Sequence, residues 1–247
     1  MEHITVTALS HPGLLRENNE DSLVAGPWTL CGTVTGNPQT LVFPLGPPVV
    51  VAVADGIGGQ PAGEVASAVV ARNLALHGPA LDGEDAVRGV LDLCNREVYA
   101  AAARDPARRT MGTTVAGVVL LADRAVVFNV GDSRVLAVRD GGLELLSVDD
   151  NPPPPPGRRT VSLLTQSLGG SREPDGIAPH LTAVPLDEGF RALVCTDGLT
   201  DPVPDEVIAR VLREHDHGRA AYELWRAAIE AGGPDNITLA LIGAGEE

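Results

Sequence analysis

Aromatic, cysteine and basic residues are all scarce in this sequence, and each scarcity excludes a class of protein. Aromatic side chains are 3% of the 247 residues while hydrophobic residues are 44%, so a large core must consist of Val, Leu, Ile and Ala. The three cysteines are widely spaced with no CxxC pair, which is typical of reduced cytosolic thiols rather than of a disulfide framework or a zinc site. Lys and Arg number 18 against 33 Asp and Glu. The resulting net charge of -15 makes nucleic acids and anionic membranes unfavourable partners.

Targeting and membrane-spanning patterns are also missing. The first residues, MEHITVTALSHPG, lack the basic and apolar regions of a signal peptide. Asp123 and Arg124 interrupt the longest apolar candidate before it reaches membrane-spanning length. We therefore expect a cytoplasmic protein. Because the sequence shows no repeat and no compositional boundary, we expect residues 1–247 to form one domain without an appended sensor or anchor.

Apolar periodicity predicts both helices and strands along the chain. Helical stripes indicate two early helices, at 61–77 with Pro61 in its first turn and at 84–104 with Asp82 as its cap, and two late ones at 205–213 and 219–231. Strands are predicted at 3–10, 23–30, 49–54, 113–122, 125–129, 134–139, 143–147, 181–186, 191–196 and 237–242. Two stacked antiparallel sheets with a helix pair on each outer face would bury every stripe. The fold prediction is therefore α+β, a four-layer α-β-β-α sandwich.

Two loops have distinctive sequences. Asp140-Gly141 predicts the turn of a hairpin between the strands at 134–139 and 143–147. The five consecutive prolines Pro152–Pro156 lie within a segment at 149–159, and they predict an exposed, polyproline-like connector.

The segment VVVAVADGIGG at 49–59 is a run of β-branched residues that ends in an aspartate and a glycine-rich turn. Asp55 would lie at the end of a buried strand, and Gly56, Gly58 and Gly59 would let backbone carbonyls approach a ligand. A carboxylate beside an exposed carbonyl suits Mg2+ or Mn2+. An equally good interpretation of this segment alone is a tight turn in which Asp55 caps the following helix.

Five other carboxylates share this position at a strand end beside glycine or asparagine. They are Glu20, Asp21, Asp132, Asp197 and Asp235. For any one of them a turn residue is the commoner explanation. Taken together, with no opposing basic cluster, they would need cations to offset their mutual repulsion.

Seven segments, which span almost the whole chain, carry a resemblance to a known family. They are RENNED at 16–21, DGIGG at 55–59, MGTT at 111–114, NVGDSR at 129–134, LTQSLG at 164–169, CTDGL at 195–199 and DN at 235–236. In these segments and their order the chain resembles the metal-dependent protein phosphatases of type 2C, of the bacterial type, which act on phosphoserine and phosphothreonine. The family fold, a β-sandwich flanked by helix pairs, agrees with the layers predicted above.

The resemblance implies a site for two Mn2+ or Mg2+ ions, with a weaker third. Asp55 would bridge the two ions, and the Gly56 carbonyl would bind one of them. The remaining metal-site residues would be Asp197 and Asp235 on the other ion, Glu20 and Asp21 acting through metal-bound waters, and Asp132 with Asp197 at the third site.

Arg16 would receive the phosphate and, with Asp55 and Asp197, make up the catalytic set. Two ions about 3.5–4 Å apart would activate a water, orient it and neutralise developing charge, while Arg16 offers a planar fork for phosphate oxygens. Without the resemblance, Arg16 would be read as a surface arginine paired with Glu17. The implied substrates are phosphorylated proteins in signalling, either a Ser/Thr kinase or its targets.

Two features depart from many relatives. Ile57 stands where eukaryotic relatives have a histidine that is a candidate general acid, so no donor for the leaving group is evident. The flap segment at 149–161 is short and filled with proline, which bears on substrate choice. The threonines at 113–114 are expected to pack beneath the metals, and the six histidines show no shared metal-binding spacing.

Two alternatives stay open. One is a non-catalytic, phosphoprotein-binding regulatory relative, although a protein that only binds has no need of Asp55, Asp197 and Asp235 together. The other is a phosphatase that acts on a regulator of transcription, such as an anti-sigma antagonist. The sequence does not distinguish this function from a general reversal of phosphorylation by a kinase.

Overall fold

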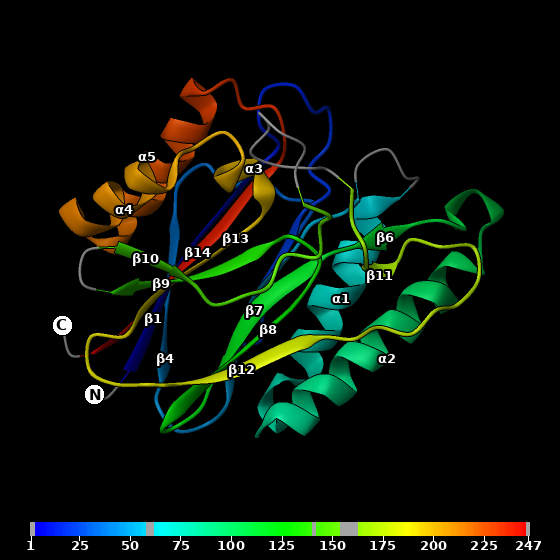
Figure 1. Cartoon of the computed structure of the whole chain (residues 1–247), viewed down its shortest axis with the longest axis horizontal. Coiled ribbons are helices and arrows are strands. Elements are labelled where there is room, and N and C mark those ends of the chain that lie inside the picture. The colour runs from blue at the N-terminus through cyan, green and yellow to red at the C-terminus, as the bar shows by residue number, and fades with distance from the viewer. Residues whose placement is uncertain (1–2, 58–61, 140–141, 154–162, 246–247) are drawn as a thin grey trace.

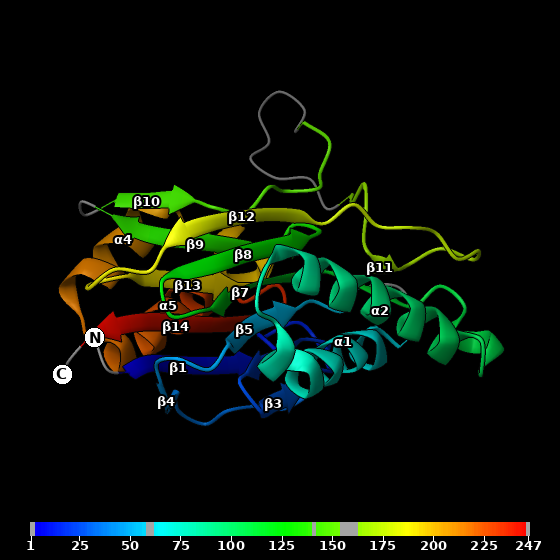
Figure 2. The same ribbon diagram turned by 90° about the horizontal axis from the view of Figure 1, so that it is seen from below.

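Two β-sheets are stacked face to face between two pairs of helices in this protein (Figures 1 and 2). The structure, a computed structural model, describes residues 3–57, 62–139, 142–153 and 163–245. One six-stranded sheet has the order β10-β9-β13-β14-β1-β4 and the other β12-β8-β7-β5-β2-β3, while β6 and β11 form a separate ladder. All the described pairings within these sheets are antiparallel. The predicted α+β, four-layer architecture is confirmed.

The elements have the following bounds. The strands are β1 (His3–His11), β2 (Ser22–Ala25), β3 (Trp28–Cys31), β4 (Gln39–Pro44), β5 (Val49–Ala54), β6 (Gly112–Thr113), β7 (Val115–Leu120), β8 (Arg124–Val130), β9 (Arg134–Arg139), β10 (Gly142–Leu145), β11 (Leu168–Gly169), β12 (His180–Pro185), β13 (Arg191–Cys195) and β14 (Ile237–Gly245). The α-helices are α1 (Gly63–His77), α2 (Glu84–Ala102), α3 (Asp197–Thr200), α4 (Asp205–Glu214) and α5 (His217–Glu230), with short 3-10 helices at Gly78–Ala80 and Pro106–Arg108.

Three apolar layers stabilise this stack. Val51 of β5 packs between the two sheets, whereas its neighbour Val50 faces α1 and α2 on the outer side. On the other outer face, Ile208 of α4 and Leu224 of α5 pack with Leu241 of β14. Since the central strands are buried on both faces, Val49–Ala54 needs no polar alternation, and all six of its residues are buried.

The prediction of a single strand at 23–30 is wrong. The segment forms two paired strands, β2 and β3, whose register matches Ala25 with Trp28. Gly26 between them has φ +55°, a conformation that glycine adopts without strain, and Pro27 has no N–H for a ladder. The edge strand β4, which pairs with β1, was not among the predicted strands.

The four predicted helices are confirmed in place as α1, α2, α4 and α5, with two corrections. Asp82 does not cap α2, because the capping position is Gly83 and no side chain caps this end. A short helix that was not predicted, α3, follows β13. Pro61, Gly58 and Gly59 lie outside the described residues. Among the described residues, no helix combines the length and the apolar character needed to cross a membrane.

The predicted hairpin at 134–147 is confirmed by the pairing of β9 with β10, although its turn, Asp140-Gly141, lies outside the described residues. Most of the proline run, from Pro154 onward, lies outside them as well. Cys31, Cys94 and Cys195 are all described and all unpaired, and the last two are buried.

The antiparallel register brings the ends of several strands to one edge of the sandwich. His11 at the end of β1 is opposite Ile237 at the start of β14, and Cys195 at the end of β13 is opposite Leu239. Segments following β1, β13 and preceding β14 therefore meet, and these segments contain most of the predicted carboxylates.

Candidate active site

Asp55 lies at the end of β5, where its backbone is held by the two threonines that precede β7. Its N–H donates to Thr114 Oγ1 at 3.1 Å. Its carbonyl accepts from the Thr114 N–H at 2.9 Å and from Thr113 Oγ1 at 2.7 Å. These threonines therefore position Asp55 directly, beyond the packing role expected for them.

The alternative in which Asp55 caps the following helix is wrong. Helix α1 begins at Gly63 after Ala62, and no side chain caps it. The Asp55 carboxyl points instead into a pocket of about 380 Å³. The pocket is lined by Arg16, Asp55, Ile57, Thr114, Asp132, Leu164, Asp197, Gly198, Asp201, Pro202, Pro234 and Asp235.

Glu20 lies beside this pocket, against two glycines that approach each other closely. A Cβ on Gly63 would lie 2.6 Å from Glu20 Oε2, and one on Gly56 would lie 2.7 Å from the Glu20 carbonyl oxygen. Only glycine at both positions lets the segment after β5 and the start of α1 fit around the Glu20 carboxyl. Burial first, and then the charge of Glu64, raise the pKa of Glu20.

Asp197 is the first residue of α3, directly after β13. The residue before it, Thr196, donates from Oγ1 to Asp21 Oδ2 at 3.0 Å, which joins the end of β13 to the start of β2. Asp21 is almost completely buried and is not among the residues that line the pocket. It therefore lies beneath the pocket lining.

Asp235 precedes β14 and connects to Arg16, which donates from Nη2 to Asp235 Oδ2 at 2.7 Å. The alternative for Arg16, a surface arginine paired with Glu17, is therefore not what the structure shows. Next along the chain, Asn236 Oδ1 accepts the N–H of Glu20 at 2.8 Å. Its Nδ2 donates to the carbonyls of Pro12 at 3.0 Å and Asn18 at 2.9 Å. Asn236 thus fixes the whole loop that presents Arg16 and Glu20.

Asp132 lies in the turn between β8 and β9 and lines the same pocket as Arg16. Its Oδ2 accepts from Asn151 Nδ2 at 3.1 Å. The flanking segment is held by Arg134, which binds both carboxylate oxygens of Asp149, with a shortest distance of 2.6 Å. The start of the short flap is therefore attached to the rim of the pocket by two side-chain contacts.

The electrostatics of the pocket are those of crowded, buried carboxylates. Burial, and then the charges of Asp132, Asp201 and Asp235, raise the pKa of Asp197 to about 8. Burial raises the pKa of Asp21 to about 7, with smaller contributions from Asp235 and Glu20. The pKa of Asp55 is also well above its usual range, because of burial and the nearby Asp21 and Asp197.

Three buried carboxylate oxygens at this site have no hydrogen-bond partner among the described residues. They are Glu20 Oε2, Asp21 Oδ1 and Asp197 Oδ1. Buried polar atoms are nearly always satisfied, so three such oxygens around one pocket indicate a cationic ligand. Hard divalent cations prefer oxygen donors of this kind, and the residues present fit them.

The donors do not form a compact cage. In the described part of the chain, no group of three or more His, Cys, Asp or Glu side chains could hold an ion by itself. Mg2+ and similar ions usually keep several waters and use only one or two carboxylates. The arrangement therefore suits ions held by pairs of groups and completed by water.

Four further residues contribute to this site although the sequence assigned them no role: Asn236 and Thr196, which lie in two of the family segments, and Asn151 and Asp201. Asp201 had a readable signal, since it lies four residues after Asp197, on the same face of a helical turn. The other three act through contacts between segments distant in the chain, which no local pattern reveals.

A family model described as protein phosphatase 2C matches residues 44–237. The chain belongs to the protein phosphatase 2C family. Among its relatives, the serine/threonine protein phosphatase PstP of Mycobacterium tuberculosis is 33% identical over 248 residues, which cover 94% of this chain and 43% of PstP. The protein phosphatase PhpP of Streptococcus pneumoniae is 30% identical over 79% of this chain and 85% of its own length.

A solved structure of the catalytic domain of PstP in complex with two manganese ions has a TM-score of 0.80 and 30% identity, with both chains fully covered. The resemblance to bacterial phosphatases of type 2C and the family fold are thus confirmed. The chain spans less than half the length of PstP, so activity, substrates and partners are taken up as proposals.

Proposed function

We propose that this chain is a metal-dependent serine/threonine phosphoprotein phosphatase that hydrolyses phosphoserine and phosphothreonine esters in the pocket between Arg16 and Asp55. The observation that carries the proposal is the set of three unpartnered, buried carboxylate oxygens around that pocket, with an arginine at its mouth. Family membership and the manganese complex of the PstP catalytic domain support it.

Two Mn2+ or Mg2+ ions would bind at these carboxylates. Asp55 would bridge them, with the Gly56 carbonyl on one ion and Asp197 and Asp235 on the other. Glu20 and Asp21 would hold the water around the ions, and Asp132 with Asp197 would make a weaker third site. Two bound ions activate a water for attack on phosphorus and offset the charge that develops on the phosphoryl oxygens.

The chain's own residues prepare the pocket for that chemistry. The guanidinium of Arg16 would bind phosphoryl oxygens through its planar fork, while Asp235 holds it in place. Thr113 and Thr114 hold the backbone of Asp55, so that the proposed bridging residue is fixed at the end of β5. Ile57 has no proton to give, and no histidine is among the described residues lining the pocket.

We further propose that residues 1–247 act as one cytoplasmic catalytic domain in signalling. Its substrates would be a Ser/Thr kinase or the proteins which that kinase phosphorylates. The net charge of -15 supports protein substrates over nucleic acids and membranes.

Release of phosphate from a phosphothreonine peptide tests the proposal. With Mn2+ the wild-type protein should turn over, and EDTA should abolish the reaction. Asp55→Ala should remove nearly all activity. Asp123→Ala is the matched control, because Asp123 lies far from the pocket in the β7–β8 turn with a side chain 73% exposed, and it should leave the rate unchanged.

The same experiment separates the alternative function. A non-catalytic phosphoprotein-binding relative would bind the peptide, with or without Mn2+, and release no phosphate. If the wild-type protein binds but never turns over under any metal condition, the phosphatase proposal fails and the binding function takes its place.

A further inference from the structure

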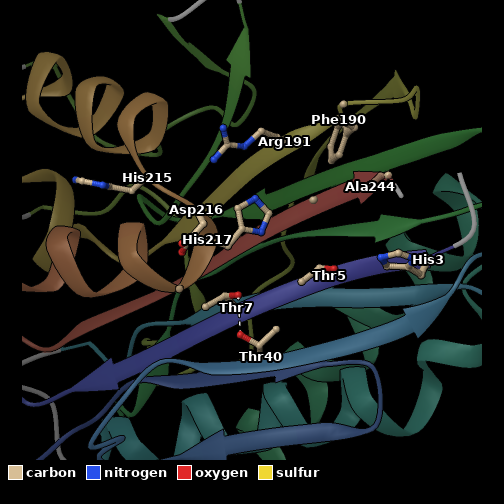
Figure 3. A pocket seen from close by; sticks show the side chains of 14 residues that line it. His3, Thr5, Thr7, Thr40, Phe190, Arg191, His215, Asp216, His217 and Ala244 are labelled. Atoms are coloured by element: carbon tan, nitrogen blue, oxygen red, sulfur yellow. Dashed lines mark hydrogen bonds between the residues drawn. The ribbon is translucent and has the colours of Figure 1, made fainter. Parts of the chain in front are cut away.

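A second pocket, of about 450 Å³, lies on the outer face of the sheet that contains β1 and β14 (Figure 3). It is bordered by the beginning of α5 and by the part of the sheet near His3, whereas the candidate active site lies beyond His11, at the other end of β1. Figure 1 shows the start of β1 and the end of β14 side by side at this end of the sheet. The residues lining the two pockets do not overlap.

The floor of this pocket is a row of three residues on adjacent strands. Gly243 of β14 is paired with Thr5 of β1 on one side and with Arg191 of β13 on the other. The imidazole of His217 lies directly over Gly243, since a Cβ built there would overlap the His217 ring. The absence of a side chain at Gly243 therefore lets the His217 ring lie on the sheet, between Thr5 and Arg191.

The lining is rich in hydrogen-bond donors. Arg191 has no hydrogen bond or ion pair with its side chain among the described residues. Thr7 and Thr40 share one hydrogen bond between their hydroxyls, 3.1 Å long, so the hydroxyl that accepts in it keeps its own proton for a ligand. Figure 3 shows the Arg191 guanidinium and the His217 ring on the same side of the sheet.

The lining does not share the negative charge of the whole protein, because with neutral histidines its one arginine is matched by one carboxylate. Arg191 and three histidines face one carboxylate, Asp216, among the described lining residues. Asp216 is already occupied, because its Oδ1 caps α5 by accepting the N–H of Arg219 at 2.8 Å. Burial first, and then the positive charge of Arg191, lower the pKa of His217, against a smaller opposing effect of Asp216. A protein with net charge -15 thus contains a pocket that is short of negative charge.

We propose that this pocket binds a phosphoryl group, with Arg191, His217 and the hydroxyl of Thr5 as its donors. These groups come from β13, α5 and β1, with the His217 ring over Gly243 between Arg191 and Thr5. Such a distribution fits the several oxygens of a tetrahedral phosphoryl group better than a planar carboxylate, which one guanidinium plane can satisfy. The group could belong to free phosphate or to a phosphorylated residue of a protein. The site is independent of the proposed hydrolytic activity.

Calorimetric titration with inorganic phosphate in EDTA tests this site. Without metal ions the carboxylates of the first pocket repel phosphate, so binding reports the second pocket. We expect wild-type binding, a loss of affinity of about tenfold or more in Arg191→Gln, and a smaller loss in His217→Gln. Arg72→Gln, an exposed position on α1, is the matched control and should bind as wild type does. Failure of the wild-type protein to bind phosphate, or equal affinity in Arg191→Gln, would overturn the proposal.

Amide chemical shifts provide a second readout that needs no variant. Phosphate should perturb the amides of Gly218 and Gly243, and perturbations confined to Thr114 and Gly198 would overturn the proposal. Repeating the titration with a phosphothreonine peptide separates the two sources. Tighter binding of the peptide assigns the site to phosphorylated proteins, and equal or weaker binding assigns it to free phosphate.

Discussion

Arg16 and Asp235 are 219 residues apart in the chain, yet Arg16 donates a 2.7 Å hydrogen bond to Asp235 Oδ2 at the mouth of the candidate active site. The side chains of Arg16 and Asp235 are 40% and 34% exposed, so the pair contributes little to folding. Its consequence is positional. The pair holds Arg16, the proposed phosphate-binding residue, beside Asp235, a proposed metal-binding residue, before phosphate or metal ions bind.

This geometry predicts that the shape of Arg16 matters as well as its charge. Arg16→Lys keeps a positive charge but loses the fork, so kcat/KM for a phosphothreonine peptide should fall by about tenfold or more. Steady-state kinetics with Mn2+ measure the effect. Arg72→Lys on the exposed surface of α1 is the control. Equal kcat/KM in Arg16→Lys and wild type would show that the guanidinium does not bind the phosphoryl group.

The carboxylates should differ in importance. Asp55→Ala or Asp197→Ala should remove nearly all kcat while the protein still unfolds cooperatively, because each change deletes a proposed ligand of the two central ions. Asp132→Ala should cost less, since Asp132 belongs to the weaker third site. Comparing kcat at saturating Mn2+ ranks the three, and a loss in Asp132→Ala as large as in Asp55→Ala would refute this ranking.

The metal-free protein should become less stable as pH rises from about 4 to about 8. The pKa of Asp21 is raised to about 7 and that of Asp197 to about 8, both above the 3.8 of an unperturbed aspartate. The folded state therefore holds more protons than the unfolded state across this interval, and a rise in pH removes that advantage. Thermal unfolding in EDTA at a series of pH values measures the trend.

Two additions make the pH experiment specific. Mn2+ should restore stability most at the alkaline end, where it replaces the missing protons. Asp197→Asn, which cannot ionise, should flatten the pH dependence. A melting temperature in EDTA that stays constant or rises between pH 5 and 8 would contradict the assignment of these carboxyl groups as crowded and protonated.

Ile57 predicts a strong preference for good leaving groups. Its N–H donates to the Gly112 carbonyl at 3.1 Å, and its Cδ1 lies towards Gly112 and Gly170. Among the described residues, the atoms nearest to the Ile57 side chain in these contacts belong to glycines, which have no side chain to orient an imidazole. Aryl phosphates should therefore be hydrolysed much faster than alkyl ones, and Ile57→His should gain far less than the hundredfold or so that a well-placed general acid contributes. A rate gain of about a hundredfold in Ile57→His would contradict this prediction, because it would show that the site already orients a general acid.

Much of the local structure can be predicted from the sequence because its causes are local. The uninterrupted apolar run Val49–Ala54 predicts a strand buried on both faces, and Asp55 follows at its end. The stripe of α2, with Val87, Leu91 and Val98 at helical spacing, predicts a helix that packs on one side, and these residues are buried. The same reasoning yields the four layers, since two stacked sheets between helix pairs cover every apolar face.

The parts that could not be predicted depend on which segments meet. Nothing near Asn236 in the sequence indicates that its side chain binds Glu20, Pro12 and Asn18. The hydrogen bond from Thr196 to Asp21 likewise joins residues 175 positions apart. Gly26-Pro27 is a signal for a break in the strand predicted at 23–30. The apolar residues on either side of it favour one continuous strand, and this second signal led to the wrong prediction.

The central claim, that Asp55 joins two divalent ions in the pocket beside Arg16, is tested most directly by titrating the chelator-treated protein with Mn2+ in a calorimeter. We predict two strong binding events in the wild-type protein and in Asp132→Ala. Asp55→Ala, whose fold is checked by circular dichroism, should lose both. Two undiminished strong sites in Asp55→Ala would contradict the account.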